Sequence, residues 1–212
     1  MTTIMQTSRR VLALALVFLA AGCIPVWTLV DANSRIAEND AFSVEMPTGW
    51  MWARYRGQRY DVLRDGRYQP LYVDRVWITR DGGNLEFIDA VRFNYEDAFP
   101  YIKKEYKAGM LPSEAAELYI ANLKNAGLDN MTVVQNTPKR IAGRNGFELH
   151  IQYKNGKGLQ FERIADAFGD KTGFYVVTYQ APNLYYYPLY RDTYYRVVAS
   201  LKIKSGARPG KS

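Results

Sequence analysis

Arginine and aromatic side chains alternate along one short stretch of this chain. The members whose chemistry suits ligand binding are Trp52, Arg54, Arg56, Arg59, Tyr60 and Arg64. Guanidinium groups form paired hydrogen bonds with carboxylates and phosphates, and aromatic rings stack on flat ligand faces. In an extended strand, alternate side chains such as Trp52, Arg54 and Arg56 share one face. The stretch predicts a surface that binds a protein or an anionic polymer, and the alternative is a solvated basic strand.

Closely spaced carboxylates offer a second chemistry, the acid–base catalysis of a glycan-cleaving enzyme. The candidate pairs are Asp89 with Glu86 and Glu162 with Asp166. Glycosidases place two carboxyl groups on opposite sides of the scissile bond, roughly 5 to 9.5 Å apart. Glu162 and Asp166 are four residues apart on an expected strand, and this spacing separates them by about 13 Å. That distance argues against the second pair.

Two polar residues lie on expected strands. Asp89 interrupts an otherwise apolar face. If it is buried it needs an arginine partner, for which Arg80 and Arg92 are candidates, and a bulge that turns it outward is the simpler expectation. His150 is the only histidine and lies on the polar face of an expected strand, so we expect it to be solvated.

The sequence lacks the residues that several other chemistries need. One histidine and one cysteine, far apart, cannot form a zinc site with four nitrogen or sulfur ligands. No Gly-x-Ser-x-Gly elbow is present, and the segment 169–172 lacks the glycine that a phosphate-binding loop has before its lysine. We therefore expect no catalytic residue, no metal and no cofactor.

The first 23 residues have the order of an export signal. Arg9 and Arg10 precede an apolar run, 11–22, which is shorter than the roughly 20 residues that span a bilayer. Small residues then precede Cys23, the only cysteine. The pattern resembles a bacterial lipoprotein signal, which implies cleavage between Gly22 and Cys23 and a diacylglyceryl group on the thiol. The alternative is ordinary cleavage that leaves a free cysteine.

Position 24 and the overall charge bear on where such a protein would act. Gram-negative lipoproteins with Asp after the cysteine are commonly retained in the inner membrane, and here the residue is Ile24. The resemblance implies the outer membrane, facing the periplasm, or the outer face of the plasma membrane in a Gram-positive cell. Loss of the two signal arginines lowers the formal charge from +7 to +5. The basic balance favours anionic partners, and export argues against nucleic acid.

Four segments follow from composition and pattern. We expect a signal peptide at 1–22, the lipidated cysteine and a tether at 23–40, a single domain at 41–203 and a basic flexible tail at 204–212. Alternating or apolar patterns predict strands near 42–46, 50–56, 71–80, 85–94, 131–136, 146–154, 159–168 and 173–180. The apolar stripes predict helices at 112–126 and 188–200, with a short one near 97–107. The strand at 173–180 is apolar on both faces and should be central.

Hairpin turns between neighbouring strands imply a largely antiparallel sheet of about six or seven strands, with helices covering its faces. The fold class is α+β. Three segments resemble the PsbP-like fold family: 42–50 (FSVEMPTGW), 141–149 (IAGRNGFEL) and 175–182 followed by a helix ending at Leu201. The resemblance covers roughly 41–203 and implies an α/β/α sandwich used as an adaptor. The matched motifs hold no catalytic residue.

These observations favour a non-enzymatic envelope lipoprotein, attached to the bilayer through acylated Cys23, that binds a protein or an anionic component. It would do so through the basic stretch or the tyrosine-rich segment 185–195. A small glycan-acting enzyme and a purely structural accessory subunit are the alternatives. The sequence leaves the oligomeric state open.

Overall fold

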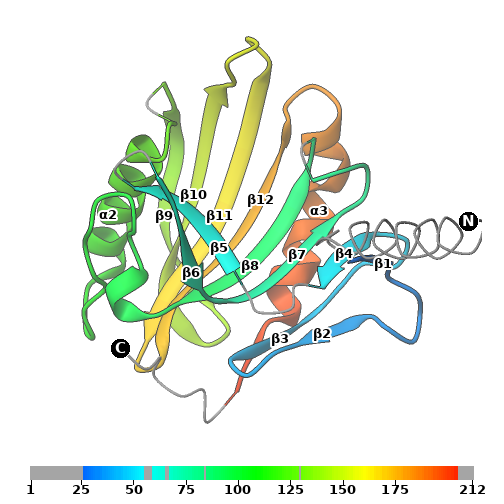
Figure 1. The fold of residues 1–212 in the computed structure, drawn as a ribbon, viewed down its shortest axis with the longest axis horizontal. Helices are drawn as coiled ribbons and strands as arrows, with labels where there is room; N and C mark the ends of the chain where they lie inside the picture. Colours follow the sequence, from blue (N-terminus) through cyan, green and yellow to red (C-terminus); the bar gives the residue numbers. More distant parts are fainter. Residues whose placement is uncertain (1–25, 55–58, 65–66, 84, 129, 205–212) are drawn as a thin grey trace, which may run out of the picture.

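An antiparallel sheet of eight strands forms the centre of the fold (Figure 1). The computed structural model describes residues 26–54, 59–64, 67–83, 85–128 and 130–204. In order across the sheet, the strands are β1 (Val26–Leu29), β4 (Met51–Arg54), β7 (Asp74–Thr79), β8 (Phe87–Phe93), β12 (Gly173–Pro182), β11 (Gln160–Asp170), β10 (Arg144–Lys154) and β9 (Thr132–Ile141). The predicted α+β class with a largely antiparallel sheet is confirmed.

β12 lies between β8 and β11 and is buried along almost its whole length. Apolar side chains on both faces of a strand are stable only where both faces are covered. The prediction of a central strand at 173–180 is therefore confirmed.

One helix covers each face of the sheet, which gives an α/β/α arrangement (Figure 1). α2 (Pro112–Asn125) begins at a proline, whose missing N–H costs nothing in the first turn. It buries Ala116, Tyr119 and Leu123 against the sheet. α3 (Tyr186–Ser200) buries Tyr187, Tyr194 and Val197 against the opposite face. Neither helix is long and apolar enough to span a bilayer, as judged over the described residues.

Part of the predicted tether belongs to the folded domain. β1 pairs with β4, and β2 (Ile36–Glu38) forms a small sheet with β3 (Phe42–Glu45) and β13 (Lys202–Ile203). Short strands of this kind are specified by their partners more than by their own sequence, because the hydrogen bonds that stabilise them are non-local. The prediction of a tether at 23–40 is therefore wrong for residues 26–40, which belong to the folded domain. The signal segment 1–22, Cys23 and the tail beyond 204 lie outside the described residues.

A separate hairpin of β5 (Arg59–Arg64) and β6 (Arg67–Tyr72) lies on the α2 side of the sheet (Figure 1). Val62 and Leu71 are buried in the same apolar cluster as α2. After β8 the chain forms the 3-10 turn η1 (Tyr95–Asp97) and then irregular turns, so the short helix predicted at 97–107 is absent there.

Candidate functional site

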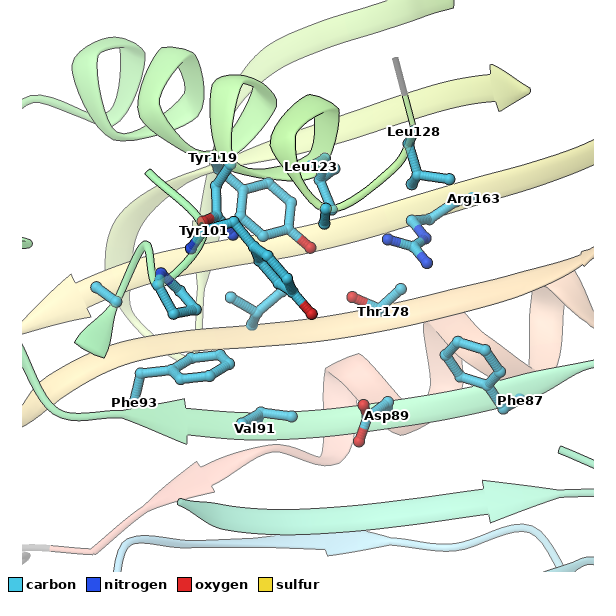
Figure 2. A pocket seen from close by; sticks show the side chains of 15 residues that line it. Phe87, Asp89, Val91, Phe93, Tyr101, Tyr119, Leu123, Leu128, Arg163 and Thr178 are labelled. Atoms are coloured by element: carbon cyan, nitrogen blue, oxygen red, sulfur yellow. Dashed lines mark hydrogen bonds between the residues drawn. The ribbon is translucent and has the colours of Figure 1, made fainter. Parts of the chain in front are cut away.

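A cavity of about 240 Å³ lies between α2 and the sheet (Figure 2). Its floor is formed by β8, with contributions from β12 and β11, and its roof by α2 and the loop at 98–101. Phe87, Val91 and Phe93 project into it from alternate positions of β8, as the two-residue period of a strand requires. Among the described residues that line the cavity, Asp89 is the one acid and Arg163 the one base.

Asp89 is buried on the cavity floor and paired with an arginine. The Arg75 Nε atom donates to Asp89 Oδ1 at 2.7 Å, and Nη2 donates to Oδ2 at 2.9 Å. The expected outward bulge is wrong, because β8 keeps a regular register with both neighbouring strands. The expected partners are wrong too, since Arg92 pairs with Asp74 instead and Arg80 donates to the Gly49 carbonyl oxygen. A bidentate pair of this kind satisfies the buried carboxylate.

Arg163 has a different environment. Its Nε and Nη2 atoms both donate to Gln180 Oε1, a neutral acceptor, and its guanidinium lies 6.0 Å from the centre of the Tyr153 ring. No acid in the described part of the chain forms an ion pair with it. A guanidinium has five donors, so donors of Arg163 remain for a further acceptor.

Two tyrosines place hydroxyl groups in the cavity. Figure 2 shows the Tyr101 and Tyr119 hydroxyls directed toward the same region as Thr178 and the Arg163 guanidinium. Burial raises the pKa of Tyr119, while the charge of Arg163 and a hydrogen bond with Thr178 oppose that rise. Tyr101 is positioned by its backbone N–H, which donates to Asn122 Oδ1 at 2.8 Å. The cavity therefore combines apolar walls with a convergent group of polar atoms.

A second polar cluster lies beneath α3. Lys139 Nζ donates to Glu148 Oε2 at 2.6 Å and lies 2.8 Å from Asp166 Oδ1. The Tyr194 hydroxyl donates to Asp166 Oδ2 at 2.7 Å. Burial raises the pKa of Asp166, whereas the hydrogen bonds from Lys139 and Tyr194 lower it, and the balance is a rise. Lys139 thus bridges two acidic side chains, Glu148 and Asp166, which are paired residues of β10 and β11.

His150 belongs to the same face and is not solvated as predicted. Its ring stacks on Tyr187 of α3 at 5.5 Å, and its Nε2 atom lies 2.6 Å from Glu162 Oε2. The polar stripe of β10 looked solvated because polar residues usually mark an exposed face, yet α3 covers it. Glu162 therefore faces His150, and Asp166 faces Lys139 and Tyr194, so the structure does not bring these two carboxylates together.

The residues of the predicted binding stretch divide between the two faces of the sheet. Trp52 is half-buried and packs against the core on the α3 side, whereas the β5–β6 hairpin packs on the α2 side. Arg54 ends β4, Arg59, Tyr60 and Arg64 lie on β5, and Arg56 lies outside the described residues. Sequence reasoning missed Arg163 and Arg75. The alternation of β8 around Asp89 was the one signal that could have led to the cavity.

No group of three or more metal-ligating side chains occurs among the described residues. The acidic side chains described above have protein partners instead: Asp89 pairs with Arg75, Glu148 with Lys139 and Glu162 with His150. Glu86 is fully buried and accepts from Thr79 and from the backbone N–H groups of Arg80 and Asp81. It therefore closes the turn between β7 and β8 and does not face Asp89 across a cleft.

Comparison with protein-family models finds no match, and comparison with curated protein sequences finds none either. Three solved structures are similar in part. The solution structure of cyanobacterial PsbP (CyanoP) from Synechocystis sp. PCC 6803 is 12% identical, with 87% of this chain and 96% of that chain covered and a TM-score of 0.49. PA94 from Pseudomonas aeruginosa, a protein of unknown function described as a putative regulator, is 11% identical, with 66% and 93% covered and a TM-score of 0.41.

The third is LpqN of Mycobacterium tuberculosis, described as involved in cell envelope biogenesis. It is 9% identical, with 85% of this chain and 91% of that chain covered and a TM-score of 0.38. At identities of 9 to 12% these likenesses concern the fold alone. One of the three structures is a PsbP protein.

Proposed function

We propose that this chain is an exported protein held to a cell-envelope membrane by lipid on Cys23, and that it works without catalysis by binding an anionic envelope component. Residues 1–23 have the arginines, the apolar run and the small residues before cysteine that a lipoprotein export signal requires, and this pattern supports the anchor. The basic stretch that begins at Arg54 supports the class of partner. A protein partner on the same surface is the second candidate.

The register of β1 against β4 is the observation that carries this proposal. Val26 lies directly opposite Arg54, and paired residues have Cα atoms about 4.5 to 5.5 Å apart. Three Cα-to-Cα steps separate Cys23 from Val26, and they span at most about 11 Å. An acyl group on Cys23 would therefore keep the start of the basic stretch no farther than about 16 Å from the bilayer surface, the distance reached when the link is fully extended. Attraction to anionic headgroups acts within about one Debye length, roughly 8 Å at physiological salt, so the proposal requires this segment to lie nearer than that upper limit.

The hairpin that follows is also basic. Arg64 and Arg67 are paired residues at the end of β5 and β6. Each basic residue close to an anionic membrane contributes about 1 kcal/mol of binding. The anionic component that fits best is thus a phospholipid headgroup of the membrane that holds the anchor.

Vesicle binding by the processed, unacylated chain (Cys23→Ser) tests the surface. We expect it to sediment with phosphatidylglycerol vesicles and not with phosphatidylcholine vesicles, and added salt should release it. Replacing Arg54, Arg59 and Arg64 with Gln should weaken binding at least tenfold, since about 1 kcal/mol is lost at each position. The matched control replaces three exposed cations outside both candidate binding segments, Arg140, Lys157 and Arg196, with Gln.

The control triple has the same net charge as the test triple, so equal losses in both would contradict a localised surface. If neither vesicle is bound and crosslinking in intact cells captures an envelope protein through the same arginines, the partner is a protein. If Cys23→Ser is still labelled with palmitate, the proposal that lipid on Cys23 anchors the protein is wrong.

A further inference from the structure

We propose that the cavity between α2 and the sheet binds a small monocarboxylate with an apolar body, a single ring or a short chain, and that Arg163 holds its carboxylate. The proposed anchoring and membrane contact make no use of this cavity. The inference rests on the size of the cavity, the character of its walls and the state of its two charged residues.

The volume and the walls set the size and the polarity of the ligand. Ligand pockets usually measure about 300 to 1,000 Å³, and a cavity of about 240 Å³, just below that range, suits a small ligand. Phe87, Val91 and Phe93 from β8 and Leu123 from α2 line it with apolar surface. Such walls favour a ligand whose body is a ring or a short apolar chain.

The charges select an anion. Both oxygens of Asp89 already accept from the Arg75 guanidinium, so this acid is balanced within the protein. Arg163 donates to a neutral amide and faces no acid in the described part of the chain. Asp89, Arg75 and Arg163 together carry one excess positive charge, which a monoanion neutralises and a dianion would overcompensate. The planar guanidinium fork matches a carboxylate.

Hydroxyl groups complete the site. Tyr101 and Tyr119 extend their hydroxyls toward the region that the Arg163 guanidinium faces, with Thr178 beside them (Figure 2). A carboxylate offers two oxygens and about four acceptor positions. One oxygen bound by Arg163 and one by a tyrosine hydroxyl would leave the apolar body against Val91 and Phe93.

Calorimetric titration with phenylacetate and with octanoate tests the proposal, using the processed chain. At least one probe should bind saturably, and phenylacetamide, the neutral analogue of the same shape, should bind at least tenfold more weakly. Arg163→Gln should weaken carboxylate binding about ten- to a hundredfold, the usual loss of a hydrogen bond to a charged group. Arg191→Gln, which changes the same charge on the exposed side of α3, should leave binding unchanged.

If Arg163→Gln folds poorly, a second variant that fills the cavity can test the proposal in its place. Val91→Phe places a ring in the empty volume, so it should abolish binding while the melting temperature stays level or rises. Three results would overturn the proposal: neither carboxylate binds at millimolar concentration, phenylacetamide binds as tightly as phenylacetate, or Val91→Phe folds and binds normally. If zwitterionic phenylalanine binds more tightly than phenylacetate, and Asp89→Asn removes that preference, the monocarboxylate proposal is wrong and the cavity binds an amino acid.

Discussion

Removing the cation beneath α3 should destabilise the fold in a manner that depends on pH. Lys139→Met deletes the ammonium group that contacts both Glu148 and Asp166. Breaking a buried ion pair by removing one partner costs about 3 to 5 kcal/mol. The Lys139 side chain is 29% exposed and that of Glu148 13%, so water can partly replace the lost contact. We therefore expect a loss near the lower end, about 3 kcal/mol at pH 8.

The sign of the pH dependence follows from Asp166. Burial already raises its pKa above 3.8, and loss of the lysine raises that pKa further. The folded state then holds the proton more tightly than the unfolded chain does, so stability falls as pH rises from about 4 through the folded-state pKa. Asp166 is more protonated at pH 4 than at pH 8, and a protonated Asp166 can stay bonded to Tyr194 without a cation beside it. The loss relative to the parent should be smallest there.

Urea unfolding at pH 4, 5, 6 and 8, followed by tyrosine and tryptophan fluorescence, measures both quantities. A loss of about 3 kcal/mol corresponds to a fall in melting temperature of about 6 to 12 °C for a domain of this size. Lys157→Met, in an exposed loop, is the control. Adding Asp166→Asn to Lys139→Met should restore most of the stability at pH 8, because it removes the uncompensated charge. A loss that is the same at pH 4 and pH 8 would refute this account of the cluster.

Three further perturbations test other parts of the structure. Cys23→Ala should abolish incorporation of labelled palmitate and release the chain from the envelope membrane fraction; a labelled, membrane-bound variant would rule the anchor out. Gly146→Ala should lower stability by roughly 2 kcal/mol in chemical denaturation, because the new methyl group would overlap the Ala167 carbonyl oxygen; unchanged stability would mean that the two strands can separate there. Asp89→Asn should cost about 3 kcal/mol by leaving the Arg75 guanidinium without its carboxylate, and a melting temperature unchanged from the parent would show that water satisfies the arginine.

The elements that local patterns specify could be predicted from the sequence. Pro112 and the apolar stripe behind it gave α2 within one residue at its end, and the doubly apolar run at 173–180 gave the central strand β12. These signals are local, because periodicity and proline geometry act within a few residues. β1 carries no such signal, and its place at the sheet edge depends on β4, 25 residues later. Without a local strand signal, residues 26–29 are indistinguishable from a linker in the sequence, and the predicted tether includes them for that reason.

The site depended on information that a single sequence does not hold. The sequence predicts an arginine partner for Asp89 only if that residue is buried, and it offers Arg80 and Arg92. The register of β7 against β8 both buries Asp89 and places Arg75 beside it. Likewise the polar stripe of β10 looked exposed, and His150 with it, because nothing local told which face α3 would cover. Which charge lies beside which is a property of strand pairing, and strand pairing is non-local.

The two faces of the sheet differ in how their charges are balanced, and this difference indicates where a ligand would bind. On the α3 side Asp166 and Glu148 share Lys139, and Glu162 faces His150, so these carboxylates have partners within the fold. A cluster satisfied in this way stabilises packing and gains little from a ligand. On the α2 side Arg163 faces a cavity and has a neutral amide where an acid would serve it better. There an arginine whose side-chain acceptor in the described part of the chain is a neutral amide lies beside a cavity of about 240 Å³, and this is the combination that an anionic ligand needs.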